Sequence, residues 1–180
     1  MPGLDAVWAL HDYGPVLQRY LVAAKNQGRR DLLDLFGRRL AELPILAQLD
    51  PEAMVTWVPA SRAGRRRRGY DQGRLLARAV GRHGRRPVLP LLSRAGSSGQ
   101  AGLGRSQRLV GPDLSCRVSS VPARLIVIDD VITTGASLAA AAAALRQAGA
   151  LGVIGLCVAS ADSGAATARR PSPYSQHLVI

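Results

Sequence analysis

Two adjacent acids followed by a hydroxyl-rich turn form the stretch best suited to bind a ligand. Asp129 and Asp130 come directly after an apolar run at residues 125–128. The turn beyond them leads into an alanine-rich segment and consists of Thr133, Thr134, Gly135, Ala136 and Ser137. Amides at the start of a helix are unpaired and carry the positive end of the helix dipole. The turn therefore predicts a phosphate cradle with added hydroxyl donors.

The paired acids predict a site for a sugar or a hydrated cation. Two carboxylates repel by about 1 kcal/mol at 4 Å in water and by about 4 kcal/mol at an intermediate dielectric. Sugar hydroxyls or hydrated Mg²⁺ would compensate for that repulsion. A ribose 5-phosphate fits both features, with its 2- and 3-hydroxyls on Asp129 and Asp130 and its phosphate in the turn. The alternative is purely structural: the acids end a strand, and Thr133 or Ser137 caps a helix.

Other common sites lack their sequence patterns. The chain has neither a G-x-x-x-x-G-K-[ST] loop nor a G-x-G-x-x-G turn. Cys116 and Cys157 are far apart and have no clustered histidines, so neither a zinc site nor a disulfide framework is indicated. The histidines are isolated and are interpreted as surface or packing residues.

Hydrophobic spacing predicts the elements that must position the acids. Two amphipathic helices are expected within residues 15–43, divided at 26–28, and a strand at 54–59. A helix from residue 72, a strand at 87–92 and a loop at 93–103 follow. The last elements expected are a strand at 125–128, a helix at 137–148, a strand at 153–161 and a tail with a short strand at 177–180. This alternation predicts an α/β fold with a mainly parallel sheet, whose ligands bind at the carboxyl ends of the strands.

Composition and charge restrict the class of protein. A chain of 180 residues with 47% hydrophobic residues is expected to form one compact domain. The apolar window 137–161 is interrupted by Arg146 and glycines, so no membrane span is predicted. No secretory signal is visible at the start of the sequence, and we expect a cytoplasmic protein.

The net charge of +12 raises the hypothesis of a nucleic-acid surface. Lys25 is the only lysine, and the cations are otherwise arginine. A coding bias towards Ala, Gly and Arg would produce the same composition without a functional cause. Both interpretations stay open at this point.

The string LIVIDDVITTGAS, residues 125–137, resembles the phosphoribosyl-diphosphate motif of the type I phosphoribosyltransferases over all thirteen positions. The resemblance implies a five-stranded parallel core with flanking helices and a small hood, here residues 51–180 and 1–50 respectively. It also implies Mg²⁺ as cofactor, with no direct protein ligand, and transfer of ribose 5-phosphate to a nitrogen nucleophile with loss of pyrophosphate.

Further strings resemble the ComF/GntX (competence protein F-like) branch of that family. The matching positions are Tyr13, Lys25, Gly28, Arg68, Gly69, Tyr70, Gln72, Gln100, Leu103, Arg105, Arg108 and Leu109. The chain departs from the branch in two respects: it has no cysteine-rich zinc ribbon, and Asp71 replaces the more usual Asn.

The resemblance implies roles for two further groups of residues. Pyrophosphate would bind at Pro59, Ala60, Ser61 and Arg62, and Arg65, Arg68, Arg105 and Arg108 could close over it. Two functions follow as hypotheses. One is a Mg²⁺-dependent transferase that binds phosphoribosyl diphosphate and an unknown acceptor. The other is a competence accessory protein that senses a nucleotide or sugar phosphate and contacts single-stranded DNA or a DNA-translocating ATPase or helicase.

Overall fold

The computed structural model describes residues 1–95 and 111–161. Residues 96–110 and 162–180 lie outside this description. Most of the loop expected at 93–103 and the terminal strand expected at 177–180 therefore fall on residues that the structure does not describe.

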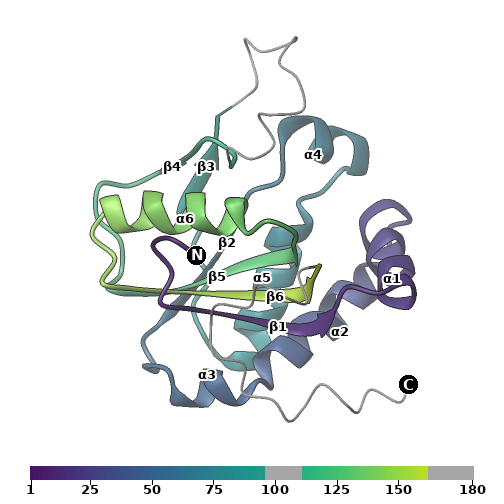
Figure 1. Ribbon diagram of the computed structural model, residues 1–180, viewed down its shortest axis with the longest axis horizontal. Helices are drawn as coiled ribbons and strands as arrows, with labels where there is room; N and C mark the ends of the chain where they lie inside the picture. The colour runs from purple at the N-terminus through teal and green to yellow at the C-terminus, as the bar shows by residue number, and fades with distance from the viewer. Residues whose placement is uncertain (96–110, 162–180) are drawn as a thin grey trace.

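A parallel sheet forms the centre of the molecule (Figure 1). Its strands lie in the spatial order β1 (Ala6–Asp12), β6 (Gly152–Ser160), β5 (Arg124–Ile132) and β2 (Met54–Trp57). All neighbouring pairs are parallel. The α/β architecture with a mainly parallel sheet is thus confirmed.

The sheet ends beyond β2 in a single bridge instead of a full fifth strand. Val88 pairs with Val55 in parallel, and the Leu89 amide donates to the Val55 carbonyl at 2.9 Å. Pro87 and Pro90 flank this bridge. Since proline has no amide hydrogen to give to a ladder, the strand predicted at 87–92 pairs with β2 only through this bridge, and its last residue, Leu92, begins another strand.

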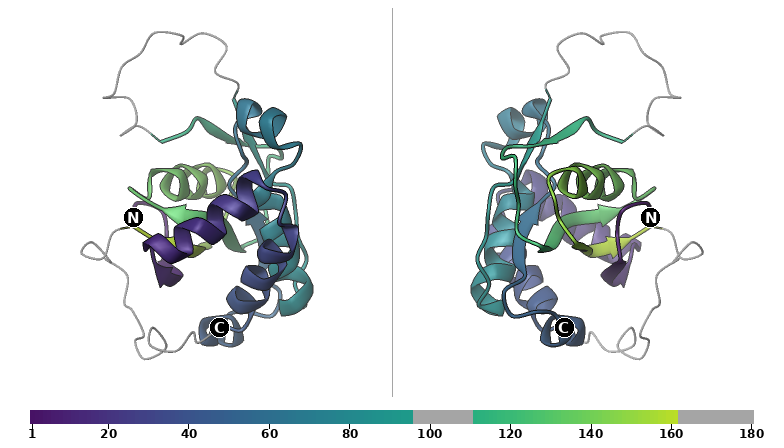
Figure 2. Two further views of the ribbon diagram at one scale, coloured as in Figure 1. Left: turned by 90° about the vertical axis from the view of Figure 1, so that its right-hand side faces the viewer. Right: turned by 90° about the vertical axis from the view of Figure 1, so that its left-hand side faces the viewer.

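Helices cover both faces of the sheet (Figures 1 and 2). Helix α6 (Ala136–Gln147) packs on one face, and α2 (Arg30–Ala41) and α5 (Gln72–Gly84) pack on the other. The last two helices approach closely, because a Cβ on Gly37 would lie only 2.3 Å from the Cβ of Ala79.

From Leu125 to Ile128, β5 places its side chains alternately on the two faces of the sheet. Leu125 and Val127 belong to the hydrophobic cluster under α6. Ile126 and Ile128 belong to the cluster under α2 and α5. Because successive strand residues point to opposite faces, the two acids that follow must also point to opposite faces.

The smaller elements surround this core. They are α1 (Pro15–Asn26), α3 (Pro44–Gln48), α4 (Arg62–Arg68), and the two strands of an antiparallel hairpin, β3 (Leu92–Arg94) and β4 (Leu114–Cys116). The two helices predicted within residues 15–43 are confirmed as α1 and α2. Within residues 1–50, interpreted as a helical hood, β1 is a strand of the core sheet, so this segment is only partly the helical unit that we expected.

Candidate functional site

Strand β5 continues through the two acids instead of ending at Ile128 as predicted. It stays paired with β6 as far as Ile132, which lies opposite Ser160. Its other neighbour ends earlier, since Trp57, the last residue of β2, pairs with Ile128. The acids therefore lie at the carboxyl edge of the sheet, on a part of β5 that has a neighbouring strand on one side only.

Asp129 points to the α6 side of the sheet. It lines a hollow formed with residues 131–138, which include the turn and the first residues of α6. Its Oδ1 accepts a hydrogen bond from the Asp130 amide at 2.9 Å. Burial, and secondarily the charge of Asp130, raise the pKa of the Asp129 carboxyl well above its usual value. The ionised form of Asp129 thus lacks full compensation within the protein.

Cys157 lies beside Asp129 on the neighbouring strand β6. The thiol is fully buried. Burial, followed by the charges of Asp129 and Asp130, raises the pKa of this thiol well above its usual value. Cys157 is therefore a packing residue under the site and not a nucleophile.

Asp130 points to the opposite face, where α1 supplies its counter-ion. The residue is 8% exposed, and its Oδ1 accepts the Val131 amide at 2.9 Å. Its Oδ2 forms an ion pair with the Nζ of Lys25. Lys25 is held in turn by Tyr70, whose hydroxyl donates to the carbonyl of Ala24 and, at 3.3 Å, to that of Lys25.

The predicted phosphate cradle is the start of α6. Gly135 is the residue before the helix and has φ of 74°, in the left-handed region that favours glycine. Thr134 Oγ1 accepts the Ala136 amide at 3.3 Å, and the Gly135 carbonyl accepts the Ala139 amide at 2.9 Å. Within the described residues, the amides of Ser137 and Leu138 have no acceptor, as expected at a helix start. Thr133 and Thr134 are exposed.

The cradle is a small hollow that Met1 partly fills. The hollow has a volume of about 30 Å³, which has room for only a few water molecules. Met1 takes part of the space: its Sδ would lie 2.5 Å from a Cβ on Gly135. A phosphoryl group could enter only after this side chain moves aside.

The predicted pyrophosphate loop follows β2 at the same edge of the sheet. Pro59 is buried, and the Ala60 amide donates to Asp71 Oδ2 at 3.2 Å. Ser61 caps α4, because its Oγ accepts the Gly64 amide at 3.1 Å, and Arg62 is the first residue of that helix. Since β2 and β5 are adjacent and parallel, this loop and the acids lie at neighbouring strand ends.

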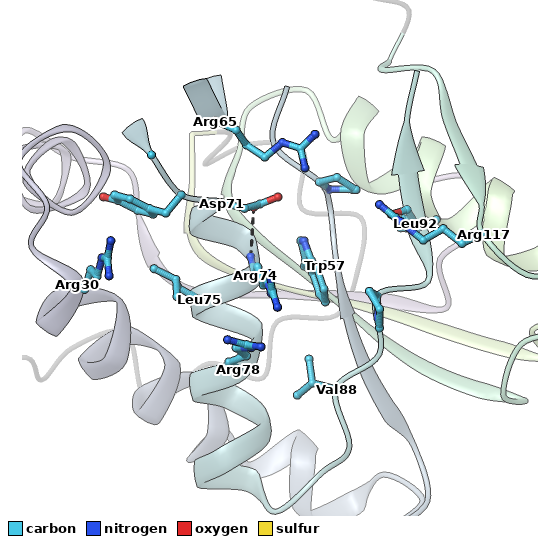
Figure 3. A pocket seen from close by; sticks show the side chains of 14 residues that line it. Arg30, Trp57, Arg65, Asp71, Arg74, Leu75, Arg78, Val88, Leu92 and Arg117 are labelled. Carbon is cyan, nitrogen blue, oxygen red and sulfur yellow. Dashed lines mark hydrogen bonds between the residues drawn. The ribbon is translucent and has the colours of Figure 1, made fainter. Parts of the chain in front are cut away.

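The four arginines expected to close over pyrophosphate lie in different places. Arg65 extends from α4 into a larger cavity beside β2, shown in Figure 3. The guanidinium of Arg68 folds back over Gly64 of the same helix. Arg105 and Arg108 lie outside the described residues.

Comparisons with known proteins give distant structural similarities only. No protein-family model matches the chain, and no curated protein matches it. A solved structure described as the allosteric regulatory enzyme of purine biosynthesis is similar, with a TM-score of 0.47 and 22% sequence identity. The similarity covers 70% of this chain and 26% of that chain, so the chain spans about a quarter of that enzyme's length. The function proposed below therefore rests on the residues of the chain itself.

Two contributors to this edge of the sheet were not predicted as site residues. Lys25 neutralises Asp130 from a helix far away in the sequence. Asp71 holds the pyrophosphate loop to α5, because it accepts both the Ala60 amide and, at 3.3 Å, the Arg74 amide. In the sequence, only the family resemblance drew attention to Lys25 and Asp71. No local pattern around either residue indicates its contacts.

The acids fit a cation that is bound mainly by a ligand. Within the described residues, no group of three or more His, Cys, Asp or Glu side chains could hold a metal ion by itself. Mg²⁺ is commonly bound by one or two carboxylates together with substrate phosphates. A cation at this edge of the sheet would therefore depend on the phosphates of a ligand, with the charge of Asp129 close by. Among the described helices, none is long and apolar enough to cross a membrane.

Proposed function

We propose that the chain binds phosphoribosyl diphosphate, or another ribose 5-phosphate ligand, at the carboxyl edge of its sheet. The observation that carries the proposal is the position of Asp129, a carboxylate with incomplete charge compensation, opposite the unpaired amides at the start of α6. A ribose phosphate supplies what each partner lacks: hydroxyl donors for the carboxylate and an anion for the amides. The string at residues 125–137 resembles the family motif for this ligand.

The two acids take different parts in this proposal. Asp129 faces the cradle and accepts hydrogen bonds from the ribose hydroxyls. Asp130 is already paired with Lys25, so it contributes less free charge and holds α1 against the site. When Mg²⁺ is bound, it supplies positive charge that neutralises the diphosphate as it leaves.

For a transfer reaction, the bond between the anomeric carbon and the diphosphate oxygen breaks, and a bond to the acceptor nitrogen forms. The protein's task is to place the ribose and to stabilise the charge that develops. The amides of Ser137 and Leu138 would hold the 5-phosphate, and the loop 59–62 would face the diphosphate. We propose an acceptor with a reactive nitrogen, and α1 as the helix that forms the hood over the site. The family we propose is the type I phosphoribosyltransferases, in the ComF/GntX branch.

Calorimetry with phosphoribosyl diphosphate and Mg²⁺ tests the binding site. We expect heat of binding for the wild type and a large loss of affinity for Asp129→Asn. Asp113→Asn, at an exposed residue after the undescribed segment, is the matched control and should bind like the wild type. Equal affinity of the wild type and Asp129→Asn would remove the acid from the site. Release of pyrophosphate in the presence of a panel of bases then tests transfer.

A second function is favoured by one specific observation, the charge of α4. This helix carries Arg62 and Arg65–Arg68 in seven residues, contains no acid, and buries none of its residues. Such a surface fits the phosphates of single-stranded DNA, or an acidic face of a DNA-translocating ATPase or helicase partner. Fluorescence anisotropy with labelled single-stranded DNA over a salt series tests it. Affinity that hardly falls with salt would contradict a contact between arginines and phosphates.

A further inference from the structure

A second cavity among the described residues lies apart from the hollow at Asp129. Its volume is about 640 Å³, within the usual range for sites of small ligands. It opens between α5 and the segment that runs from Val88 to Leu92, next to the end of β2 (Figure 3). It shares no residue with the hollow at Asp129, and from the loop 59–62 only Pro59 reaches it.

Five arginines and one acid line this cavity. The arginines come from three helices and from the chain after β4, and they are Arg30, Arg65, Arg74, Arg78 and Arg117. The acid is Asp71, whose two oxygens accept the Ala60 and Arg74 amides. The lining therefore carries four more positive than negative side chains.

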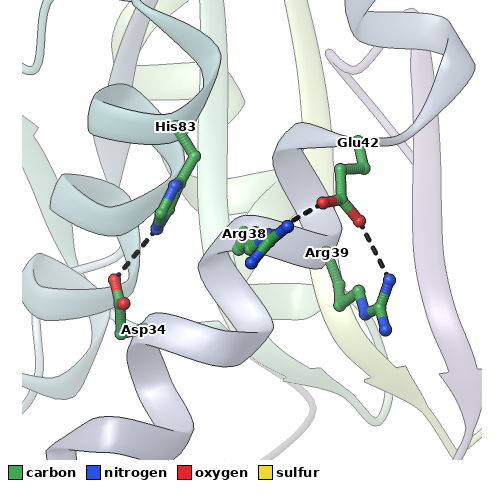
Figure 4. A network of polar contacts seen from close by, with 5 residues as sticks. All are labelled: Asp34, Arg38, Arg39, Glu42 and His83. Carbon is green, nitrogen blue, oxygen red and sulfur yellow. Dashed lines mark hydrogen bonds and ion pairs between the residues drawn. The ribbon is translucent and has the colours of Figure 1, made fainter.

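These arginines lack the acidic partners that arginines elsewhere have. Figure 4 shows the ordinary arrangement: Arg38 and Arg39 both bind Glu42, at 3.0 and 3.1 Å. On α5, Arg82 pairs with Asp34, yet Arg78, one turn earlier, forms no ion pair with any described residue. Arg65 and Arg74 likewise have no described carboxylate partner. Unpaired guanidinium groups around one concave space indicate an anionic ligand, and their fork geometry suits phosphate oxygens.

The other two of the five arginines, Arg30 and Arg117, are held in place by neighbouring groups. The guanidinium of Arg30 lies 5.1 Å from the centre of the Tyr70 ring. Arg117 donates from Nε to the Leu92 carbonyl at 2.9 Å. Both contacts leave the remaining guanidinium donors free for a ligand.

The floor of the cavity is apolar and contains an unsatisfied donor. Trp57, Leu75, Val88, Pro90 and Leu92 contribute to it. Trp57 is 9% exposed, and its indole Nε1 is buried without an acceptor among the described residues. A buried N–H without a partner is rare in proteins and costs free energy. A flat, largely apolar ring on a ligand would cover this floor.

We propose that this cavity is a second binding site, specific for a nucleoside phosphate. The phosphates bind Arg74 and Arg78 on α5, and the base packs against Trp57 and the other apolar residues of the floor. An inorganic anion would use the arginines only, and a nucleoside would use the floor only. The site goes beyond the proposed function and requires neither Asp129 nor the cradle.

Tryptophan fluorescence and calorimetry test this site with adenosine 5′-diphosphate, inorganic pyrophosphate and adenosine as probes. A Trp8→Phe background leaves Trp57 as the only tryptophan, so a change in emission reports on the cavity. We expect the diphosphate nucleotide to bind most tightly and to change the Trp57 emission. Arg74→Gln and Arg78→Gln should each weaken it about tenfold, as the loss of a hydrogen bond from a charged donor implies.

The matched control is Arg82→Gln, on the same helix but paired with Asp34 outside the cavity, and it should bind like the wild type. Asp129→Asn should also leave nucleotide binding unchanged, which separates this proposal from the proposed function. If pyrophosphate binds as tightly as the nucleotide, the floor has no role in binding. If adenosine binds as tightly as the nucleotide, the arginines have no role. Single-stranded DNA that binds through Arg74 and Arg78 while the nucleotide does not would also overturn the proposal.

Discussion

The ammonium of Lys25 on α1 forms an ion pair with the carboxylate of Asp130 near the end of β5. The contact joins an N-terminal helix to the central strand of the sheet at the edge where the candidate site lies. Tyr70 supports it from a third segment, through its hydrogen bond to the Lys25 carbonyl. Three strings that the sequence analysis related separately to one family thus meet at this point.

Replacing Lys25 by Met should destabilise the protein. The change leaves Asp130, which is 8% exposed, as a buried charge without its cation. We expect a loss of about 1–3 kcal/mol in the free energy of unfolding, measured by urea denaturation at neutral pH. Adding Asp130→Asn should recover part of the loss. Arg29→Met, which removes an exposed pair with Asp31, is the control and should change little; a similar loss in both variants would show that Lys25 stabilises the fold through general charge only.

Asp129→Asn should stabilise the folded protein at neutral pH. Burial and Asp130 raise the pKa of Asp129, so the native state holds a proton that the unfolded chain releases near pH 4. Stability therefore falls as pH rises from the ordinary Asp value through the native pKa, and the Asn variant should lose this dependence. Thermal unfolding from pH 4 to 8 measures it, with Asp113→Asn as the control. Parallel curves for the wild type and Asp129→Asn would contradict the raised pKa.

Gly135→Ala should strain the turn before α6. The residue has φ of 74°, where a Cβ costs about 1–2 kcal/mol. The new Cβ would also meet Met1. Gly14→Ala is the control, since its φ is −125° and a Cβ there meets nothing within 4 Å. Equal stability of the two variants by chemical denaturation would contradict the conformation described for this turn.

Gly37→Ala should separate α2 from α5. The added methyl would lie 2.3 Å from the Cβ of Ala79, a distance that requires the helices to shift. Overpacking of this kind costs about 1–3 kcal/mol, which urea denaturation measures. At Gly84, on α5, an added Cβ would lie 3.7 Å from Ala41, in ordinary contact, so Gly84→Ala should be far milder. Equal losses of stability in Gly37→Ala and Gly84→Ala would contradict the close contact between α2 and α5.

Sequence patterns predicted most elements that have an apolar face, although β1 was missed, and they missed α4, which has none. The spacing of leucines indicated α2 and α5, and the apolar runs indicated β5 and β6. Helix α4 buries no residue, so hydrophobic periodicity could not reveal it. Its signals are the Ser61 cap and Gly69, whose φ of 75° ends the helix. The three-residue strand β4 is likewise too short to show a period.

The candidate site was predictable where its parts are contiguous in the chain. The acids and the turn follow one another, and strand alternation separates Asp129 from Asp130. The partners that define their charge come from elsewhere: Lys25 is brought to Asp130 by the packing of α1, and Met1 reaches Gly135 through the fold of the first residues. No local rule relates residues at such separations, so the narrow hollow could not be foreseen.

The antiparallel hairpin β3–β4 has a consequence for how this protein can be altered. Arg94 pairs with Leu114, and the Ala95 amide donates to the Asp113 carbonyl at 3.1 Å, so the chain leaves and re-enters the hairpin at one place. These two points lie on a pair of strands that belongs to a separate sheet from β1, β6, β5 and β2. We therefore expect a change in chain length between Arg94 and Leu114 to leave the register of the central sheet unaltered.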